Sequence, residues 1–170
     1  MKQISIVFSK RTNFNLFSSL IMLGLQTPFS HCSIKMTDGD TGQAVYYQAS
    51  GLSVNCVPEA QFLSLETIIS QKDVTVSDKV FAAGKTFAIN QLGKPYDIAA
   101  IFGFALQIGL GLIRIQIKNP FKETGSSWVC SQLVAGYIEA CDNIALDVTD
   151  MTPKALYILM PNLPETWSGS

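Results

Sequence analysis

The stretch from Ser126 to Ala140 constrains the fold of this chain most, because a turn leads directly into the pattern of a buried helix. Ser126 or Ser127 is a suitable N-cap, since a serine hydroxyl accepts a hydrogen bond from an unpaired N–H at a helix start. The apolar residues that follow share one helix face; they are Val129, Leu133, Val134 and Tyr137. The pattern predicts a helix to about Ala140 with Cys130 in its first turn.

Cys130 is a candidate nucleophile because of this position. The first N–H groups of a helix are unpaired and its dipole is positive there, which favours a thiolate. The thiolate, with a reference thiol pKa of about 8.5 that such fields lower, is the attacking form of cysteine. The alternative is that Cys130 is a small buried core residue. A nucleophilic cysteine needs a base, and His31 is the only histidine in the chain.

His31 lies in a segment that predicts one strand of a hairpin. Apolar and polar residues roughly alternate from Phe29 to Lys35, as they do in strands. Residues 37–42 are rich in turn formers, and residues 43–49 predict the second strand. A lone histidine is otherwise most often a structural side chain, so its role depends on what lies opposite it.

Gln48 is the candidate orienting group. If Met36 pairs with Gln43 across the turn, Gln48 lies directly opposite His31, with the two Cβ atoms within about 5.5 Å. Gln48 would then accept a hydrogen bond from one ring nitrogen and turn the other toward the thiol, which completes a triad. A register shift of two residues would bring a different side chain to that place, Tyr46 or Ser50.

Four pieces of sequence follow one another in a specific order: Ser30-His31, Tyr46-Tyr47-Gln48-Ala49, Gly93-Lys94-Pro95-Tyr96-Asp97 and Trp128-Val129-Cys130-Ser131-Gln132-Leu133-Val134. Together they resemble the circularly permuted branch of the NlpC-type papain-like cysteine amidases and peptidases, in which the histidine strand precedes the cysteine helix. Residues 151–157 are similar to the closing proline-containing helix of that family. Many relatives carry an acidic residue where this chain has Gln48, and a neutral amide resembles the papain arrangement.

The resemblance implies one α+β domain over residues 1–170, a papain-like fold with a small antiparallel sheet packed against helices. Residues 161–170 would form a loose tail or a docking segment. Cys130 would attack an amide bond, His31 would act as base and then as acid, and Gln48 would orient His31. The backbone N–H of Cys130 would help to hold the oxyanion. The implied substrate is a peptide linkage of bacterial cell wall, and no cofactor is implied.

Charge and cysteine spacing exclude several classes of protein. The net charge is −1, with 12 basic and 13 acidic residues, so no strong field attracts nucleic acid or an anionic membrane. Four cysteines without close spacing and a single histidine argue against a zinc site and against a disulfide framework. Cys32 follows His31 on the same strand, so we expect it to face away from the Cys130–His31 pair, in the core. Cys56 and Cys141 are expected to be core residues or free thiols.

Two apolar segments raise the question of membranes. Ile98–Ile117 has the length of a transmembrane helix, but its three glycines and Arg114 favour a buried helix followed by an irregular end. Leu16–Leu25 follows a strand pattern and is capped by Asn13 or Asn15, which favours an ordinary helix over a signal peptide. We therefore expect no transmembrane span and a cytoplasmic or virion-associated protein.

Two rival functions stay open at this point. The same residues would serve a lipid acyl hydrolase or acyltransferase, which an apolar groove lined by residues 98–117 would favour. A non-catalytic structural or tail-associated module of a phage or secretion assembly would be favoured by a Cys130 closed to solvent. The composition, 48% hydrophobic and 15% charged, suits a protein partner bound through an apolar surface or the C-terminal tail.

Overall fold

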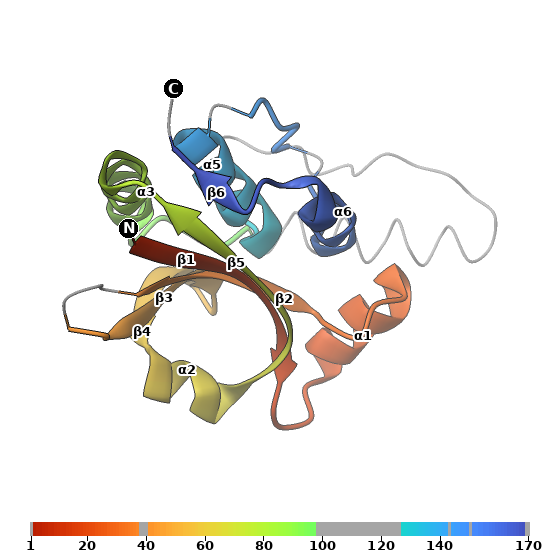
Figure 1. Ribbon diagram of the computed structural model, residues 1–170. Helices are drawn as coiled ribbons and strands as arrows, with labels where there is room; N and C mark the ends of the chain where they lie inside the picture. The colour runs from red at the N-terminus through yellow and green to blue at the C-terminus, as the bar shows by residue number, and fades with distance from the viewer. Residues whose placement is uncertain (1, 38–40, 98–126, 143, 150, 169–170) are drawn as a thin grey trace.

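The computed structural model describes residues 2–37, 41–97, 127–142, 144–149 and 151–168, which form a mixed α+β fold (Figure 1). The strands are β1 Lys2–Arg11, β2 His31–Thr37, β3 Ala44–Ser50, β4 Ser53–Pro58, β5 Glu66–Val76 and β6 Thr166–Trp167. The helices of these residues are α1 Leu16–Leu25, α2 Glu59–Leu65, α3 Asp78–Gln91, α5 Cys130–Asp142 and α6 Pro153–Leu159, with a 3-10 turn at Met160–Asn162. The α+β class predicted from the sequence is confirmed.

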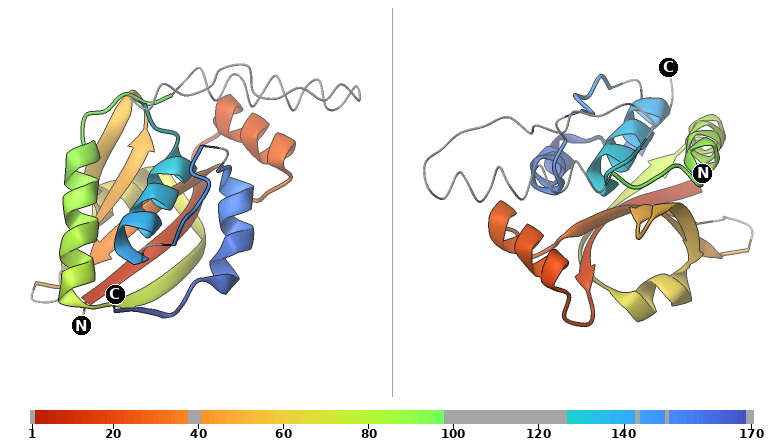
Figure 2. Two further views of the ribbon diagram at one scale, coloured as in Figure 1. Left: turned by 90° about the horizontal axis from the view of Figure 1, so that it is seen from above. Right: turned by 180° about the vertical axis from the view of Figure 1, so that it is seen from behind.

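The strands form one curled sheet in the order β4-β3-β2-β1-β5-β6. Neighbouring strands are antiparallel, except that β6 runs parallel to β5. Figures 1 and 2 show α3, α5 and α6 on one face of the sheet and α2 on the other. Helix α1 stands apart from these layers, at the end of the sheet where β2 begins.

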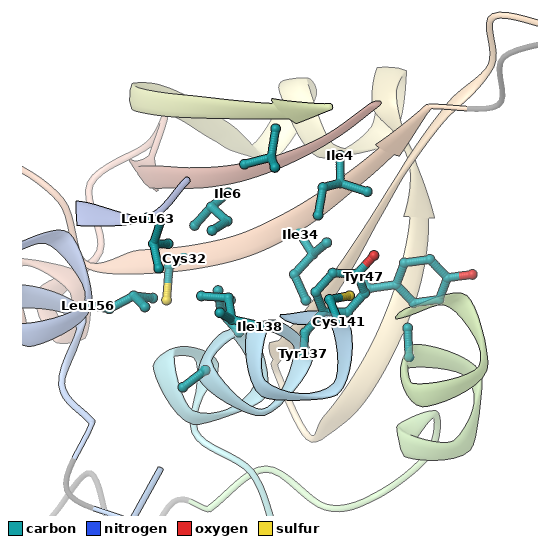
Figure 3. Close-up of a cluster of buried hydrophobic side chains, with 14 of the residues drawn as sticks. Ile4, Ile6, Cys32, Ile34, Tyr47, Tyr137, Ile138, Cys141, Leu156 and Leu163 are labelled. Carbon is teal, nitrogen blue, oxygen red and sulfur yellow. The ribbon is translucent and has the colours of Figure 1, made fainter. Parts of the chain in front are cut away.

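The two-residue period of a strand divides the core between these faces. On β1 and β2 the side chains on the face covered by α3, α5 and α6 are fully or nearly fully buried; they are Ile4, Ile6, Phe8, Cys32, Ile34 and Met36. Figure 3 labels four of them, Ile4, Ile6, Cys32 and Ile34. On the other face Val7 packs with Tyr46 and Phe62, and the last two rings are stacked at 3.9 Å. Each such side chain contributes about 1.5–3 kcal/mol on burial, so α5 is held firmly over the centre of the sheet.

The C-terminal segment was expected to be a loose tail or a docking segment, and residues 161–168 pack against the rest of the chain. Trp167 of β6 is 0% exposed and pairs with Val76 of β5. The ammonium group of Lys72 donates to the backbone oxygens of Met160 and Leu163. Burial of an indole of this size stabilises the docked position of the segment.

Among the described helices, none is long and apolar enough to cross a membrane. The segment Ile98–Ile117, for which a buried helix was expected, lies outside the described residues. Helix α1 begins after Asn15, whose side chain accepts from the N–H of Ser18, so the predicted cap of this helix is confirmed.

Gly84 provides a test of the contact between α3 and α5. A Cβ atom at this position would lie 2.7 Å from the Cys141 sulfur and still closer to the Tyr137 hydroxyl. Glycine to alanine in a helix normally stabilises by about 1 kcal/mol, but here the added methyl overpacks the core. We expect Gly84→Ala to lower the free energy of unfolding by about 1–3 kcal/mol.

Urea unfolding measures this change in the free energy of unfolding. The control is Lys85→Ala, at an exposed site on the same helix. An unchanged or higher urea midpoint would show that the helices separate more easily than this packing implies.

Candidate active site

Cys130 is the first residue of α5, as the sequence pattern predicted. Its two polar neighbours hold this end of the helix in place. The Gln132 side chain accepts from the N–H of Val129 at 3.0 Å and donates to the backbone oxygen of Thr149. The Ser131 hydroxyl donates to the backbone oxygen of Met151. A glutamine that reaches back to the N-cap N–H satisfies one of the unpaired donors at a helix start.

The predicted serine cap is wrong. Ser127 lies three residues before the helix, too far to cap it, and its hydroxyl instead donates to the Asp97 carboxylate at 2.7 Å. Ser126 lies outside the described residues. Next to this contact, Tyr96 and Trp128 form a short parallel bridge. Two of the sequence pieces that carry the family resemblance, 93–97 and 128–134, therefore lie side by side.

His31 and Gln48 are hydrogen-bonded, with 2.8 Å between His31 Nε2 and Gln48 Oε1. The strand register that places them there differs from the prediction, because Met36 pairs with Val45 and not with Gln43. Continued along both strands, this register makes Gln48 a diagonal neighbour of His31, still within reach of long side chains. Gln48 was predicted correctly from a register that is wrong by two residues, because a shift of two residues keeps every side chain on the same face of its strand. Of the two alternatives, Ser50 comes directly opposite His31 when this register is continued. Tyr46 lies on the same strand face as Gln48, but farther from His31, and its ring stacks on Phe62 of α2.

The Cys130 thiol interacts with two side chains of β2, the His31 imidazole and the Cys32 thiol. The pKa of Cys130 lies well below its ordinary value, most of all because Cys32 donates a hydrogen bond to the thiolate. Burial opposes this shift, while the hydrogen bond and charge of His31 add to it. Burial and the neighbouring Cys130 charge hold the pKa of Cys32 well above its ordinary value, so Cys32 stays protonated and remains a donor.

The expectation that Cys32 faces away from Cys130 is therefore wrong. Cys32 does point to the opposite side of the strand from the neighbouring His31, but that is the side covered by α5 (Figure 3). His31 is the first residue of β2, so both side chains reach the start of α5. The four cysteines all lie in the described part of the chain and form no disulfide: Cys56 is exposed, and Cys32, Cys130 and Cys141 are buried.

Glu66 is a further charged group at the site, and sequence reasoning missed it. Its carboxylate is buried, accepts a hydrogen bond from Ser9 at 3.0 Å and forms an ion pair with Arg11 at 3.2 Å. Burial lowers the pKa of His31, but Cys130, Glu66 and Gln48 raise it, and the net shift is upward. Glu66 is far from the histidine in sequence, and no motif marks it; only the sheet order places β5 beside β1.

A cavity of about 400 Å³ reaches this group of residues. Its walls include His31, the Arg11–Glu66 pair and two apolar side chains of α1, Phe17 and Ile21. His31 lines this cavity, whereas Cys130 is only 3% exposed. Across the described residues, no three His, Cys, Asp or Glu side chains gather closely enough to hold a metal ion.

Comparison with protein-family models and with curated proteins finds no match for this chain. The geometry of the site combines a thiol of lowered pKa at a helix start, an imidazole beside it and an amide that binds the far ring nitrogen. Such a group can form a thiolate–imidazolium pair and deliver a proton to a leaving group.

Proposed function

We propose that this chain is a cysteine-dependent hydrolase that cleaves an amide or peptide bond, built as a permuted papain-like domain of the NlpC type. The observation that carries the proposal is the position of the Cys130 thiol at the start of α5, against His31 and Cys32, which both lower its pKa. A depressed thiol pKa next to an imidazole is the usual signature of a nucleophilic cysteine.

In the proposed reaction the Cys130 thiolate attacks the substrate carbonyl carbon and the oxygen becomes an oxyanion. The backbone N–H of Cys130, at the positive end of α5, donates to that oxygen. The imidazolium of His31 gives its proton to the leaving amine, which departs and leaves a thioester on Cys130. His31 then takes a proton from water, the water oxygen attacks the thioester, and the thiolate leaves. Gln48 holds the imidazole in place throughout.

The substrate that the family resemblance favours is a peptide linkage of bacterial cell wall. The experiment incubates the purified chain with peptidoglycan and with its soluble muropeptides, and follows new amino termini by mass spectrometry. We expect cleavage by the wild-type chain and none by Cys130→Ala. The matched control is Cys56→Ala, which removes an exposed thiol outside the site and should cleave normally. Equal cleavage by Cys130→Ala would contradict the proposed nucleophile.

A lipid acyl hydrolase or acyltransferase is a second candidate, and helix α1 favours it. This helix carries no charged residue, and much of its apolar surface is exposed, with Phe14 just before it 86% exposed and Leu23 74% exposed. Phe17 and Ile21 of the same helix line the cavity at His31. Release of fatty acid from a phospholipid, with muropeptides left intact, would favour this function over peptide hydrolysis.

The third candidate, a non-catalytic module of a phage or secretion assembly, is favoured by the burial of Cys130. Only 3% of this residue is exposed, and a closed thiol was the expected mark of such a module. The lowered pKa of Cys130 argues the other way, because a purely structural buried thiol is normally raised in pKa. Reactivity of the thiol separates the two.

A further inference from the structure

The amide of Gln48 has an acceptor end and a donor end, and its orientation decides which nitrogen of His31 carries the proton. An amide oxygen only accepts, an amide nitrogen only donates, and neutral imidazole has one nitrogen of each kind. If the oxygen faces Nε2, that nitrogen must hold the proton and Nδ1 is the acceptor. If the amide were turned over, Nε2 would accept and Nδ1 would hold the proton.

Asn55 on β4 makes the contacts that determine this orientation. Its Nδ2 donates to two backbone oxygens of the adjoining turn, Ser50 at 3.0 Å and Ser53 at 3.2 Å. Backbone oxygens cannot donate, so they fix the NH₂ end of Asn55 on that side. The turn itself is held by Gly51, whose φ of 72° is favourable for glycine.

The orientation of the Asn55 amide in turn determines the orientation of the Gln48 amide. With its NH₂ group on the turn, Asn55 presents Oδ1 to Gln48, and Gln48 Nε2 donates to it at 3.2 Å. Gln48 must therefore present Oε1 to His31, and His31 Nε2 donates to it. Gln48 and Asn55 are directly paired in the β3–β4 ladder, so the sheet register maintains their contact.

We propose that Asn55 is a positioning residue that fixes the Nε2–H tautomer of His31 through Gln48. The inference rests on the proposed function in one respect, namely that His31 serves Cys130. Nδ1 is then the nitrogen that takes the thiol proton. A turned-over Gln48 would place a proton on Nδ1, and the imidazole could no longer accept from Cys130. Asn55 touches neither the sulfur nor a substrate, and its effect is exerted through the orientation of one amide.

The experiment records the imidazole nitrogen resonances of the full chain labelled with ¹⁵N-histidine. His31 is the only histidine, so the spectrum reports this ring alone. The measurement uses Cys130→Ala at mildly alkaline pH, where no thiolate holds the ring in its charged form. We expect a single Nε2–H tautomer in this parent and a mixture, or the Nδ1–H form, after Asn55→Ala. Asn55→Asp keeps an acceptor for Gln48 but removes both donors to the turn, and should restore Nε2–H.

An Nδ1–H tautomer in the parent, or a tautomer that Asn55→Ala leaves unchanged, would overturn the inference. The inference would also be overturned if the spectrum of Asn55→Asp matched that of Asn55→Ala. Asn55 would then act only by stabilising the turn, and not by accepting from Gln48. If Asn55→Ala does not fold, Asn55→Leu, which keeps the size of the side chain but offers Gln48 no acceptor, takes its place in both comparisons. No substrate is involved. A wild-type chain without hydrolytic activity would therefore refute the proposed function and leave the tautomer result standing.

Discussion

Replacing His31 with alanine is expected to slow alkylation of Cys130 at about pH 6 by roughly 10- to 100-fold. The hydrogen bond and positive charge of His31 lower the pKa of Cys130, and the burial that remains would raise it. Below its pKa, each unit of increase leaves about tenfold less thiolate, part of which is offset by a more nucleophilic sulfur. The rate is measured with iodoacetamide by mass spectrometry of the peptide that contains Cys130.

Gln48→Ala and Cys56 serve as controls for the His31 experiment. Gln48→Ala removes the partner of Nε2 but keeps the imidazole, so we expect a smaller loss of rate. The exposed Cys56 reports any general change in the protein, and its rate should be the same in all variants. A Cys130 rate that is unaffected by His31→Ala would show that the imidazole does not stabilise the thiolate.

Replacing Cys32 with alanine is expected to lower the Cys130 rate at about pH 6 by roughly tenfold. The hydrogen bond from Cys32 is the largest cause that lowers the pKa of Cys130. Cys32→Ser is the matched variant, because a hydroxyl of similar size still donates to the thiolate. It should keep a low Cys130 pKa, whereas Cys32→Ala should not. Equal rates for both variants would show that Cys32 acts only by filling the core.

Local sequence patterns predicted part of the candidate site correctly. The place of Cys130 in the first turn of a helix and the strand at His31 were predicted correctly, although the serine cap was not, because both rest on local patterns of apolar residues and turns. Gln48 was found as the partner of His31, although the hairpin pairs Met36 with Val45. A shift of two residues preserves the face of every side chain, so the diagonal neighbour stayed within reach.

The parts of the site that were missed depend on tertiary packing. Whether Cys32 faces Cys130 depends on which side of the sheet α5 covers, and strand alternation alone does not give that. Glu66 joins the site only because β5 pairs with β1, a contact between segments distant in sequence. The β3–β4 turn positions Asn55. Its role is seen only when the hydrogen bonds of the oxygen and the nitrogen are considered together in both side-chain amides, Gln48 and Asn55. Pairwise motif spacing carries no signal for any of these contacts.

The most direct test of a reactive Cys130 is the pH dependence of its alkylation in the wild-type chain, with Cys56 as internal standard. Burial of Cys130 slows the reaction by a constant factor, whereas the pH profile reports the thiolate fraction. Cys56 lies on the surface, but partial burial of its sulfur raises its pKa, so it should lose about tenfold in rate per pH unit from about pH 8 to about pH 6. A Cys130 paired with His31 should keep nearly the same rate over that range, so the ratio of the two rates should rise steeply. Parallel profiles, or a Cys130 that stays unmodified at every pH, would contradict a nucleophilic thiolate at the start of α5.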